Sequence, residues 1–249
     1  MLIDTHCHLD MLQEKERELA IKEARLKGVE RFVSCSTSFT SNQTNLALSK
    51  SNKKVLTAIG LYPLDAVEFS ESELAKAFSY FRENISKASA IGEVGLDFKW
   101  AKNESEKEKQ KKVLGDFIEL SLEYKKPLII HSRYAQRTVL EVLEQKGAGK
   151  VLLHSFTDSP KLMKRAVDDN YFVSVGMNLL FSEELQKRIT SFPLECLLFE
   201  TDTPIRFSGE KALPSKVREI AQKVVQLKEI TLKDVEKIQE KNFETLFVK

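Results

Sequence analysis

Cysteine is scarce in this chain of 249 residues. The three cysteines, Cys7, Cys35 and Cys196, are far apart and form no CxxC pair. A secreted domain that depends on disulfides has a dense and usually even set of cysteines, so this class of protein is not indicated. The same scarcity predicts a reducing, cytoplasmic location.

The chain also lacks long hydrophobic runs and an excess of charge of either sign. No apolar stretch approaches the roughly 20 residues that a membrane-spanning helix needs. No charged-then-apolar leader precedes the first predicted strand, so we expect no membrane association and no secretory leader. Lys and Arg number 39 against 37 Asp and Glu. This balance gives no general attraction to nucleic acid, which would have to be bound by local basic groups.

A dinucleotide-binding GxGxxG after a strand is absent as well, which argues against an oxidoreductase. What is present is a regular alternation of short apolar runs with longer amphipathic stretches. The runs have the length of strands and occupy residues 2–6, 31–36, 55–60, 88–95, 127–132, 150–156, 171–176 and 196–202.

Helix-like stretches separate these runs, for example at 14–28, 70–84 and 108–126. Strands that are apolar on both faces and alternate with helices indicate a parallel sheet covered by helices. The count of eight favours a closed (β/α)8 barrel of the TIM type over an open doubly wound sheet, in a single domain over residues 1–249. We expect the charged run 99–112 to be a loop that leads into an exposed helix face, and two closing helices from Pro214 onward.

Histidine is scarce too, but all four histidines end predicted strands. His6 and His8 close the first strand, and His131 and His154 close the fifth and sixth. Alternate side chains of a strand share a face, so His6 and His8 point the same way and Cys7 points the opposite way, as a packing residue. A barrel gathers the C-terminal ends of its strands into one ring, where active sites lie, so we expect the four imidazoles to converge.

Three acids occupy related positions. Glu93 ends the fourth strand and Asp202 ends the eighth, while Asp4 lies in the first strand and could orient a histidine or simply end the strand. Each residue alone has an ordinary explanation: Glu93 as an ion-pair partner, Asp202 as a helix cap, a histidine as a polar residue near a loop. Together, imidazoles and carboxylates suit a divalent transition metal, and six ligands exceed what one tetrahedral zinc needs. We therefore predict two metal ions.

Five segments, in order along the chain, resemble a known family. They are DTHCHLD at 4–10, IGEVGLDF at 91–98, PLIIHSR at 127–133, HSF at 154–156 and LLFETDTP at 197–204. The set resembles the TatD family of metal-dependent deoxyribonucleases, which belongs to the amidohydrolase superfamily of metal-bearing (β/α)8 barrels. The resemblance implies that the metals are held by His6, His8, Glu93, His131, His154 and Asp202. It also implies that Glu93 bridges two ions.

Positions around the expected pocket depart from the family pattern. GxHP after the third strand reads GLYP at 60–63, so Tyr62 replaces a histidine that lines the pocket. Tyr134 stands where an aspartate usually follows HSR. HCFSG becomes HSFTD, with Ser155 in place of cysteine and Asp158 in place of glycine. The metal ligands are thus kept while the substrate rim differs.

The resemblance and the ligand set predict phosphodiester hydrolysis. Two divalent ions, whether magnesium, manganese or zinc, would lower the pKa of a bridging water from about 15.7 toward about 7. Besides Glu93 as the bridge, we expect Asp202 to take the proton of this water as general base. The expected partner is DNA, as a single strand or at an end.

Basic and aromatic side chains near the strand ends are candidate substrate contacts. Arg133 follows His131 closely, Arg206 lies just past Asp202, and Lys99 follows the fourth strand. Arginine can hold a phosphate with two parallel hydrogen bonds, and we favour Arg133. Trp100, the single tryptophan, and Tyr62 could each stack on a base. Each of these residues could instead be an ordinary loop side chain.

Two other functions stay open at this level. The same activated water would serve a metal-dependent hydrolase of a cyclic amide, a lactone or a small phosphoester, and a barrel fold does not select among them. Glu93 favours the nuclease, because many amidohydrolases carry a carbamylated lysine on that strand. A non-catalytic metal-binding protein would be expected to have lost ligands, whereas the set here is complete.

Overall fold

A parallel sheet of eight strands forms the centre of the protein in a computed structural model, which describes residues 1–157 and 159–248. Each strand pairs in parallel with the next one along the chain. The strands are β1 (Leu2–Cys7), β2 (Val29–Cys35), β3 (Val55–Ile59), β4 (Ala90–Asp97), β5 (Leu128–Arg133), β6 (Val151–Leu153), β7 (Phe172–Val175) and β8 (Leu197–Phe199).

The sheet curls until its last strand meets its first. Past the end of β8, the backbone N–H of Asp202 donates to the carbonyl of His6 at 3.0 Å. The N–H of His8 in turn donates to the carbonyl of Thr203 at 2.8 Å. These bonds bring the residues after β8 alongside the end of β1 and nearly close the barrel. The predicted (β/α)8 architecture is confirmed.

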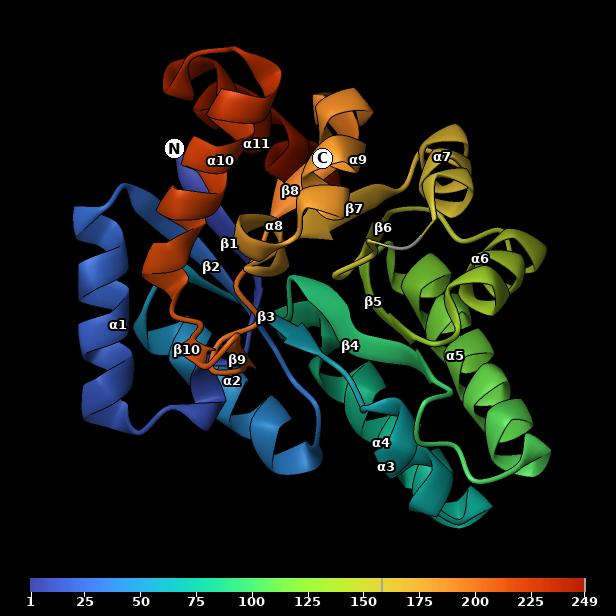
Figure 1. The fold of residues 1–249 in the computed structure, drawn as a ribbon. Coiled ribbons are helices and arrows are strands. Elements are labelled where there is room, and N and C mark those ends of the chain that lie inside the picture. Colours follow the sequence, from blue (N-terminus) through green and yellow to red (C-terminus); the bar gives the residue numbers. More distant parts are fainter. Residues whose placement is uncertain (158, 249) are drawn as a thin grey trace.

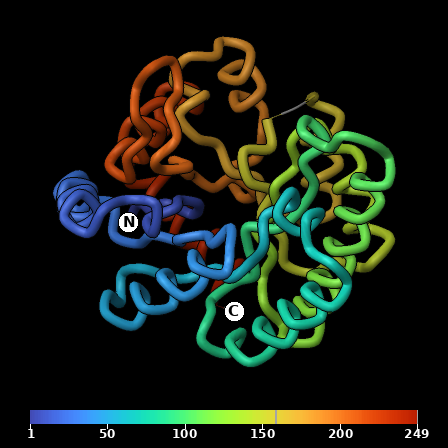
Figure 2. Tube along the Cα trace, turned by 90° about the horizontal axis from the view of Figure 1, so that it is seen from below, coloured from blue at the N-terminus to red at the C-terminus, as the bar shows by residue number. Residues whose placement is uncertain are grey.

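Helices cover the outside of the sheet, as the two views at right angles show (Figures 1 and 2). The main helices are α1 (Glu14–Leu26), α2 (Phe39–Ser51), α3 (Pro63–Glu68), α4 (Glu71–Asn84), α5 (Glu104–Tyr124), α6 (Gln136–Gln145), α7 (Pro160–Asp168), α8 (Asn178–Phe181), α9 (Glu183–Ser191), α10 (Val217–Lys228) and α11 (Leu232–Phe247). The last two are the closing helices expected after Pro214.

Helix α5 begins earlier than its hydrophobic pattern predicts. The pattern places the start at 108, but α5 starts at Glu104, because the side chain of Asn103 caps it by accepting a hydrogen bond from the N–H of Glu106 at 3.0 Å. The prediction that 99–112 is a loop is therefore wrong beyond residue 103. Those charged residues form the exposed first turns of the helix.

The core has two layers, one inside the barrel and one between the barrel and the helices. Inside lie small and branched side chains such as Ile3, Val33 and Ile129, and α11 packs against this layer with Phe243. The outer layer is larger, and Phe117 of α5 is a representative member. A sheet that is apolar on both faces requires both layers, and this explains why its strands show no alternation with polar residues.

Candidate metal centre

Two histidines of the first strand bring one ring nitrogen each to a single point in the barrel mouth. His6 lies in β1, and His8 directly follows the last residue of the strand. Their Nε2 atoms are 3.2 Å apart, and the rings are nearly perpendicular. Cys7 between them packs in the outer hydrophobic layer, as the alternation of strand side chains predicts.

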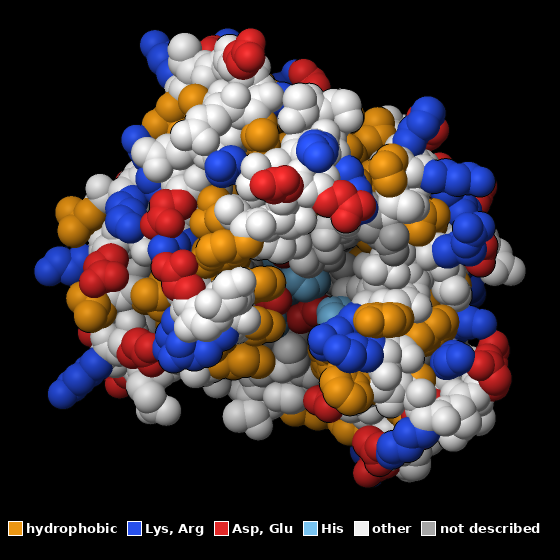
Figure 3. All heavy atoms as spheres, in the orientation of Figure 1, with side chains coloured by type: hydrophobic (Ala, Val, Ile, Leu, Met, Phe, Trp, Pro, Cys, Tyr) orange, Lys and Arg blue, Asp and Glu red, His pale blue; other side chains and the backbone are white. Residues whose placement is uncertain are grey.

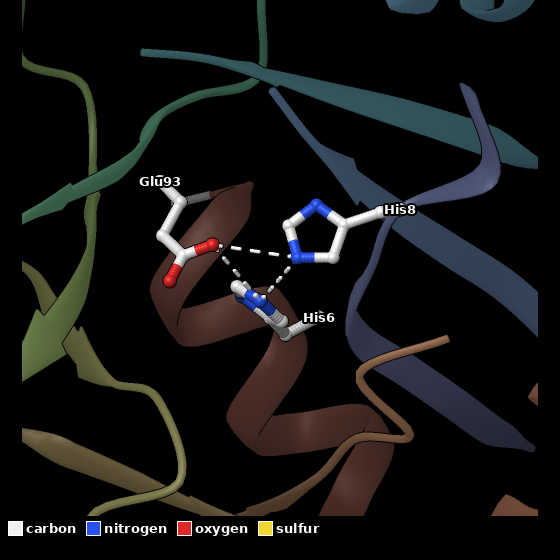
Figure 4. Close-up of side chains that lie close together, drawn as sticks. All are labelled: His6, His8 and Glu93. Carbon is white, nitrogen blue, oxygen red and sulfur yellow. Dashed lines mark hydrogen bonds and ion pairs between the residues drawn. The ribbon is translucent and has the colours of Figure 1, made fainter. Parts of the chain in front are cut away.

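Two carboxylates face the same point. Oε2 of Glu93 lies 3.6 Å from Nε2 of His6 and 3.3 Å from Nε2 of His8, and Figure 4 shows this oxygen directed at both rings. Oδ1 of Asp202 lies 3.5 and 3.3 Å from the same two nitrogens. Ligand atoms around a tetrahedral zinc are roughly 3.3–3.6 Å apart. The spacing of these four atoms therefore fits one metal ion.

The second oxygen of Glu93 faces the other two histidines. Oε1 lies 2.7 Å from Nδ1 of His131 and 3.9 Å from Nε2 of His154. Oδ2 of Asp202 is 4.0 Å from the same nitrogen of His154. Glu93 therefore presents one oxygen to each of two groups of donor atoms, as a carboxylate that bridges two ions would.

Two buried nitrogens of this cluster, Nδ1 of His6 and Nδ1 of His131, have no hydrogen-bond partner among the described residues. The nitrogen of His131 is close to Glu93 but is not aligned for a hydrogen bond. Buried polar atoms are nearly always paired, so these two need an explanation. A metal ion held by the nitrogen of His131 and the carboxylate would supply it for that atom. Imidazoles mixed with carboxylates fit a divalent transition metal.

The two acids of the cluster are ionised at neutral pH. Burial opposes the charge on Glu93, but His6, His131 and His8 outweigh it and hold the pKa of this carboxyl well below its usual range. Burial also opposes the charge on Asp202, and hydrogen bonding with His6 and His8 nevertheless lowers its pKa. Both carboxylates can therefore hold cations.

The histidines differ in their protonation. Burial and the charge of His154 lower the pKa of His6, whose ring is neutral. Burial acts in the same direction on His8, but Asp202 and Glu93 raise its pKa well above the ordinary value. The pKa of His154 is raised to about 10, because the carboxylate of Glu200 outweighs the burial penalty. A metal ion must displace the protons of His8 and His154 to bind there.

Outer hydrogen bonds fix the orientation of the imidazoles. Nδ1 of His8 lies 2.9 Å from the carbonyl oxygen of Cys35, to which it donates, so Nε2 is the nitrogen that can bind a metal once its proton is displaced. Nδ1 of His154 lies 2.9 Å from Oε2 of Glu200, and the hydroxyl of Ser174 donates to that same oxygen. Such outer partners set the tautomer and the basicity of a ligating histidine.

Tyr62 takes part in a third outer contact. Its hydroxyl donates to Oδ2 of Asp97 at 2.8 Å and lies 3.2 Å from Nε2 of His131. The same Asp97 oxygen is 3.4 Å from that nitrogen. The far edge of the His131 ring is thereby held, and Nδ1 is turned toward Glu93. Tyr62 therefore contacts His131 of the donor cluster and lines the cavity, as its position in the sequence predicts.

Asp4 does not orient a histidine ring, contrary to one of the two readings of its position. Its carboxylate accepts hydrogen bonds from the backbone N–H and the hydroxyl of Thr201, at 3.0 and 2.6 Å. It does not end the strand either, because β1 continues to Cys7. Asp4 instead ties β1 to the segment that carries Asp202.

A glycine allows β4 and β5 to approach each other beside the donor cluster. Gly95 has a φ of +147°, and a Cβ at this position would lie 2.0 Å from the carbonyl oxygen of His131. Any side chain would push β5 away and shift His131 relative to Glu93.

A cavity of about 590 Å³ opens above the donor atoms. Figure 3 shows histidine side chains at the floor of this hollow, with basic and hydrophobic side chains around it. Met11, Ile205 and Phe207 supply an apolar part of the lining. Tyr62 and Arg133 supply a polar part.

The remaining predicted substrate contacts lie at different distances from this cavity. Lys99 is exposed and is not part of the lining; its Nζ lies 5.1 Å from the ring centroid of Trp100. Arg206 lies in a small hairpin of β9 (Arg206–Phe207) and β10 (Glu210–Lys211), where its guanidinium donates to the carbonyl of Gly209 at 2.8 Å. Its neighbours line the cavity, but Arg206 is not part of the lining. Asp158 lies outside the described residues.

Sequence reasoning missed two acids of this site, Asp97 and Glu200. Both are buried and contact a histidine of the cluster. The sequence did contain a signal. Glu200 is two residues before Asp202, and Asp97 is the last residue of β4, the strand that carries Glu93. An acid at the C-terminal end of a barrel strand is a candidate partner for whatever the strand ends bind.

Comparisons with known proteins agree with this geometry. Residues 3–248 match the family model described as TatD related DNase. The chain is 33% identical to the uncharacterized metal-dependent hydrolase YabD of Bacillus subtilis, over 99% of both chains. It is 30% identical to the human deoxyribonuclease TATDN3, over 100% of this chain and 95% of that one. The crystal structure of YjjV, a TatD homologue from Escherichia coli K12, superposes with a TM-score of 0.89 at 25% identity, over 99% of this chain and 97% of that one.

Among the described residues, no helix combines the length and the apolar character that crossing a bilayer requires.

Proposed function

This chain belongs to the TatD family of metal-dependent hydrolases, and we propose that it is a deoxyribonuclease that hydrolyses phosphodiester bonds with two divalent ions. The observation that carries the proposal is the position of Glu93, whose two oxygens face two separate groups of nitrogen donors. A metal pair that clamps the attacking and leaving oxygens is a common solution for phosphoryl chemistry.

In this proposal His6, His8, Asp202 and one oxygen of Glu93 would hold one ion. The other oxygen of Glu93, with His131 and His154, would hold the second ion, and magnesium, manganese and zinc are the candidates. When bound, such ions acidify a water and stabilise the negative charge that develops on the phosphoryl oxygens.

Asp202 is the proposed general base. Its carboxylate is ionised at neutral pH and lies on the lining of the cavity, so it can accept a proton from a water there. Its backbone adopts a left-handed φ of 57°, a conformation that aspartate tolerates better than most residues. Glu93 is less accessible, with 4% of its side chain exposed against 13% for Asp202, and is proposed as the bridge.

The size of the cavity favours a single strand or a strand end as the substrate. A volume of about 590 Å³ is that of a site for a small molecule, so it admits a nucleotide but not the width of a duplex. Arg133, on the lining, is the proposed contact for the phosphate, with Tyr62 beside it. Lys99 and Arg206 are proposed as outer contacts.

We also propose that the protein works in the cytoplasm. Its three cysteines are unpaired thiols, and two of them, Cys7 and Cys35, are fully buried. Free thiols are typical of a reducing compartment.

The test of the proposed function uses metal-stripped protein and a single-stranded DNA oligonucleotide labelled at either its 3′ or its 5′ end. Magnesium, manganese or zinc is added back singly. We expect metal-dependent shortening by the wild type, and none by Asp202→Asn, which stays folded and retains most of its metal. Asp65→Asn is the matched control, because Asp65 lines the same cavity but is exposed.

A protein that binds two ions and cuts no oligonucleotide with any metal would refute the proposal and favour a hydrolase of small molecules. Full activity of Asp202→Asn would refute only the role of this residue as base.

A further inference from the structure

Two exposed aromatic rings and two cations gather at one side of the cavity mouth. Trp100 is 55% exposed and Tyr134 is 73% exposed, both unusual for large aromatic side chains. Lys99 lies between them, with Nζ 5.1 Å from the centroid of Trp100 and 5.9 Å from that of Tyr134. The guanidinium carbon of Arg133 lies 6.0 Å from the centroid of Trp100. We call these four residues the rim cluster.

The strand pairing explains why these residues meet. Asp97 at the end of β4 pairs with Arg133 at the end of β5, and the N–H of Phe98 donates to the carbonyl of Arg133 at 2.9 Å. The two residues that follow Phe98 therefore emerge beside Tyr134. The cluster is built on the ends of two adjacent barrel strands, which gives it a rigid base.

The cations of the cluster are available for a ligand. Within the part of the chain that the structure describes, neither Lys99 nor Arg133 has an acidic partner within 4 Å. Some other surface cations are paired, for example Lys112 with Glu71 and Lys146 with Glu119. What distinguishes these two cations is their position, because Arg133 lines the reactive cavity and both lie close to the ring of Trp100.

The backbone at Tyr134 supports a role beyond filling space. Its φ is 57°, in the left-handed region where a bulky residue is uncommon. Glycine, asparagine or aspartate would fit there with less strain, and a tyrosine that is 73% exposed gains little burial in return. Strained residues with no packing benefit tend to mark binding sites.

On the basis of the proposed function, we propose that the rim cluster is a second binding site for the DNA strand whose scissile phosphate lies in the cavity. Bases next to that phosphate stack on Trp100 and Tyr134, while Lys99 and Arg133 bind the phosphates between them. Flat rings interleaved with cations match the alternation of bases and phosphates in a single strand. Within a duplex the bases are stacked on one another and present no face to these rings.

The surroundings of Trp100 also set the direction of the strand. Beyond this residue lies a separate pocket whose lining includes Glu68 and Glu106, with Nζ of Lys102 3.8 Å from Oε1 of Glu68. Two acids against one cation make this side less favourable for a phosphate than the side toward Tyr134 and Arg133. The strand therefore leaves the cavity between Arg133 and Tyr134.

The test measures two properties of the same set of variants, Trp100→Ala, Trp100→Phe and Tyr134→Asn. Asparagine is used at 134 because it tolerates the left-handed backbone. The first property is the affinity for a fluorescein-labelled 12-mer of oligothymidylate, measured by anisotropy with calcium in place of the catalytic metal. The second is the hydrolysis of that oligonucleotide and of bis(4-nitrophenyl) phosphate, which is too small to reach the rim.

We expect Trp100→Ala and Tyr134→Asn each to weaken oligonucleotide binding by roughly tenfold, as the loss of one stacked base would. The KM for the oligonucleotide should rise in parallel, while hydrolysis of the small ester stays unchanged. Trp100→Phe should restore most of the affinity, because it keeps an aromatic face. A double-stranded 12-mer should bind more weakly than the single strand and be insensitive to both changes.

The charges are tested by the salt dependence of binding. Replacing Lys99 by alanine removes one phosphate contact, so the slope of log affinity against log salt should decrease by about 0.7 for a single strand. Lys164→Ala is the matched control, since this lysine is exposed and pairs with Asp168 on α7. Its slope should equal that of the wild type.

The outcomes separate this inference from the proposed nuclease activity. Unchanged oligonucleotide affinity in Trp100→Ala and Tyr134→Asn would overturn the rim site, even if the wild type cuts DNA. Affinity that depends on the rim in a protein that cuts no DNA would keep the rim site and refute the nuclease. Failure of the wild type to bind the oligonucleotide at all would overturn both.

Discussion

The proposed bridging role of Glu93 leads to a prediction about metal stoichiometry. Its two oxygens serve two donor groups, at 3.3 Å from Nε2 of His8 and 2.7 Å from Nδ1 of His131. Glu93→Gln keeps the size of the side chain but replaces one oxygen with an amide nitrogen, which has no lone pair for a cation. The remaining oxygen can serve only one group. We therefore expect the variant to bind one ion per chain where the wild type binds two.

The expected cost to catalysis follows from the charge that the lost ion would have stabilised. A metal ion contributes several kcal/mol of transition-state stabilisation. Since each 1.36 kcal/mol corresponds to a factor of ten, kcat/KM should fall by about a thousandfold.

The measurement is the metal-to-protein ratio by plasma mass spectrometry after dialysis against a known free concentration of each metal. Circular dichroism establishes that the variant is folded, and Asp65→Asn controls for the loss of one acid from the cavity lining. Retention of two ions with wild-type affinity by Glu93→Gln would refute the bridging role and the reasoning from the two oxygens.

Two further predictions address the outer contacts and the core. Metal affinity of the wild type should rise with pH, because the pKa of His154 is raised to about 10 and metal must displace its proton. Glu200→Gln lacks the carboxylate that raises this pKa, so calorimetry between pH 6 and 9 should show a shallower rise of its metal affinity. Equal slopes for the variant and the wild type would contradict the role of Glu200 in raising the pKa of His154. Phe117→Ala should destabilise the protein by about 3–5 kcal/mol in urea unfolding, because the ring is buried against Phe78 at a centroid distance of 4.7 Å. Leu122→Ala, on the exposed side of the same helix, should destabilise it far less. Similar losses of stability in the two variants would show that α5 does not anchor the outer core layer.

The sequence by itself was sufficient for the architecture and for the members of the donor cluster. Apolar runs that alternate with amphipathic helices specify parallel strands, and parallel strands place all their C-terminal ends on one side. His131 and Glu93, far apart in sequence, could therefore be assigned to one site from their positions in the runs. The alternation of side chains along a strand also separated Cys7 from its neighbours, as the structure shows.

Boundaries were less predictable, because they depend on single side chains. Periodicity alone could not place the start of α5, which one hydrogen bond from the Glu106 N–H to the side chain of Asn103 moves to Glu104. Asp4 shows the same limit. Its position in the strand allowed two readings. The contact with Thr201, which lies 197 residues later, excludes the first, and the continuation of β1 to Cys7 excludes the second.

Only the tertiary structure decided which atoms meet. Side-chain orientation decides that the two oxygens of Glu93 face two different donor groups. It also decides the hydrogen bond from Tyr62 to Asp97 beside His131, and the hydrogen bond in the hairpin that keeps Arg206 off the cavity lining. The gathering of the rim cluster on two neighbouring strands depends on it as well. The physical reason is that strand order fixes where a Cα lies to within a residue, whereas a ligand or a hydrogen bond requires atoms placed to a few tenths of an ångström. That precision comes from packing and backbone contacts between segments that are remote in the chain.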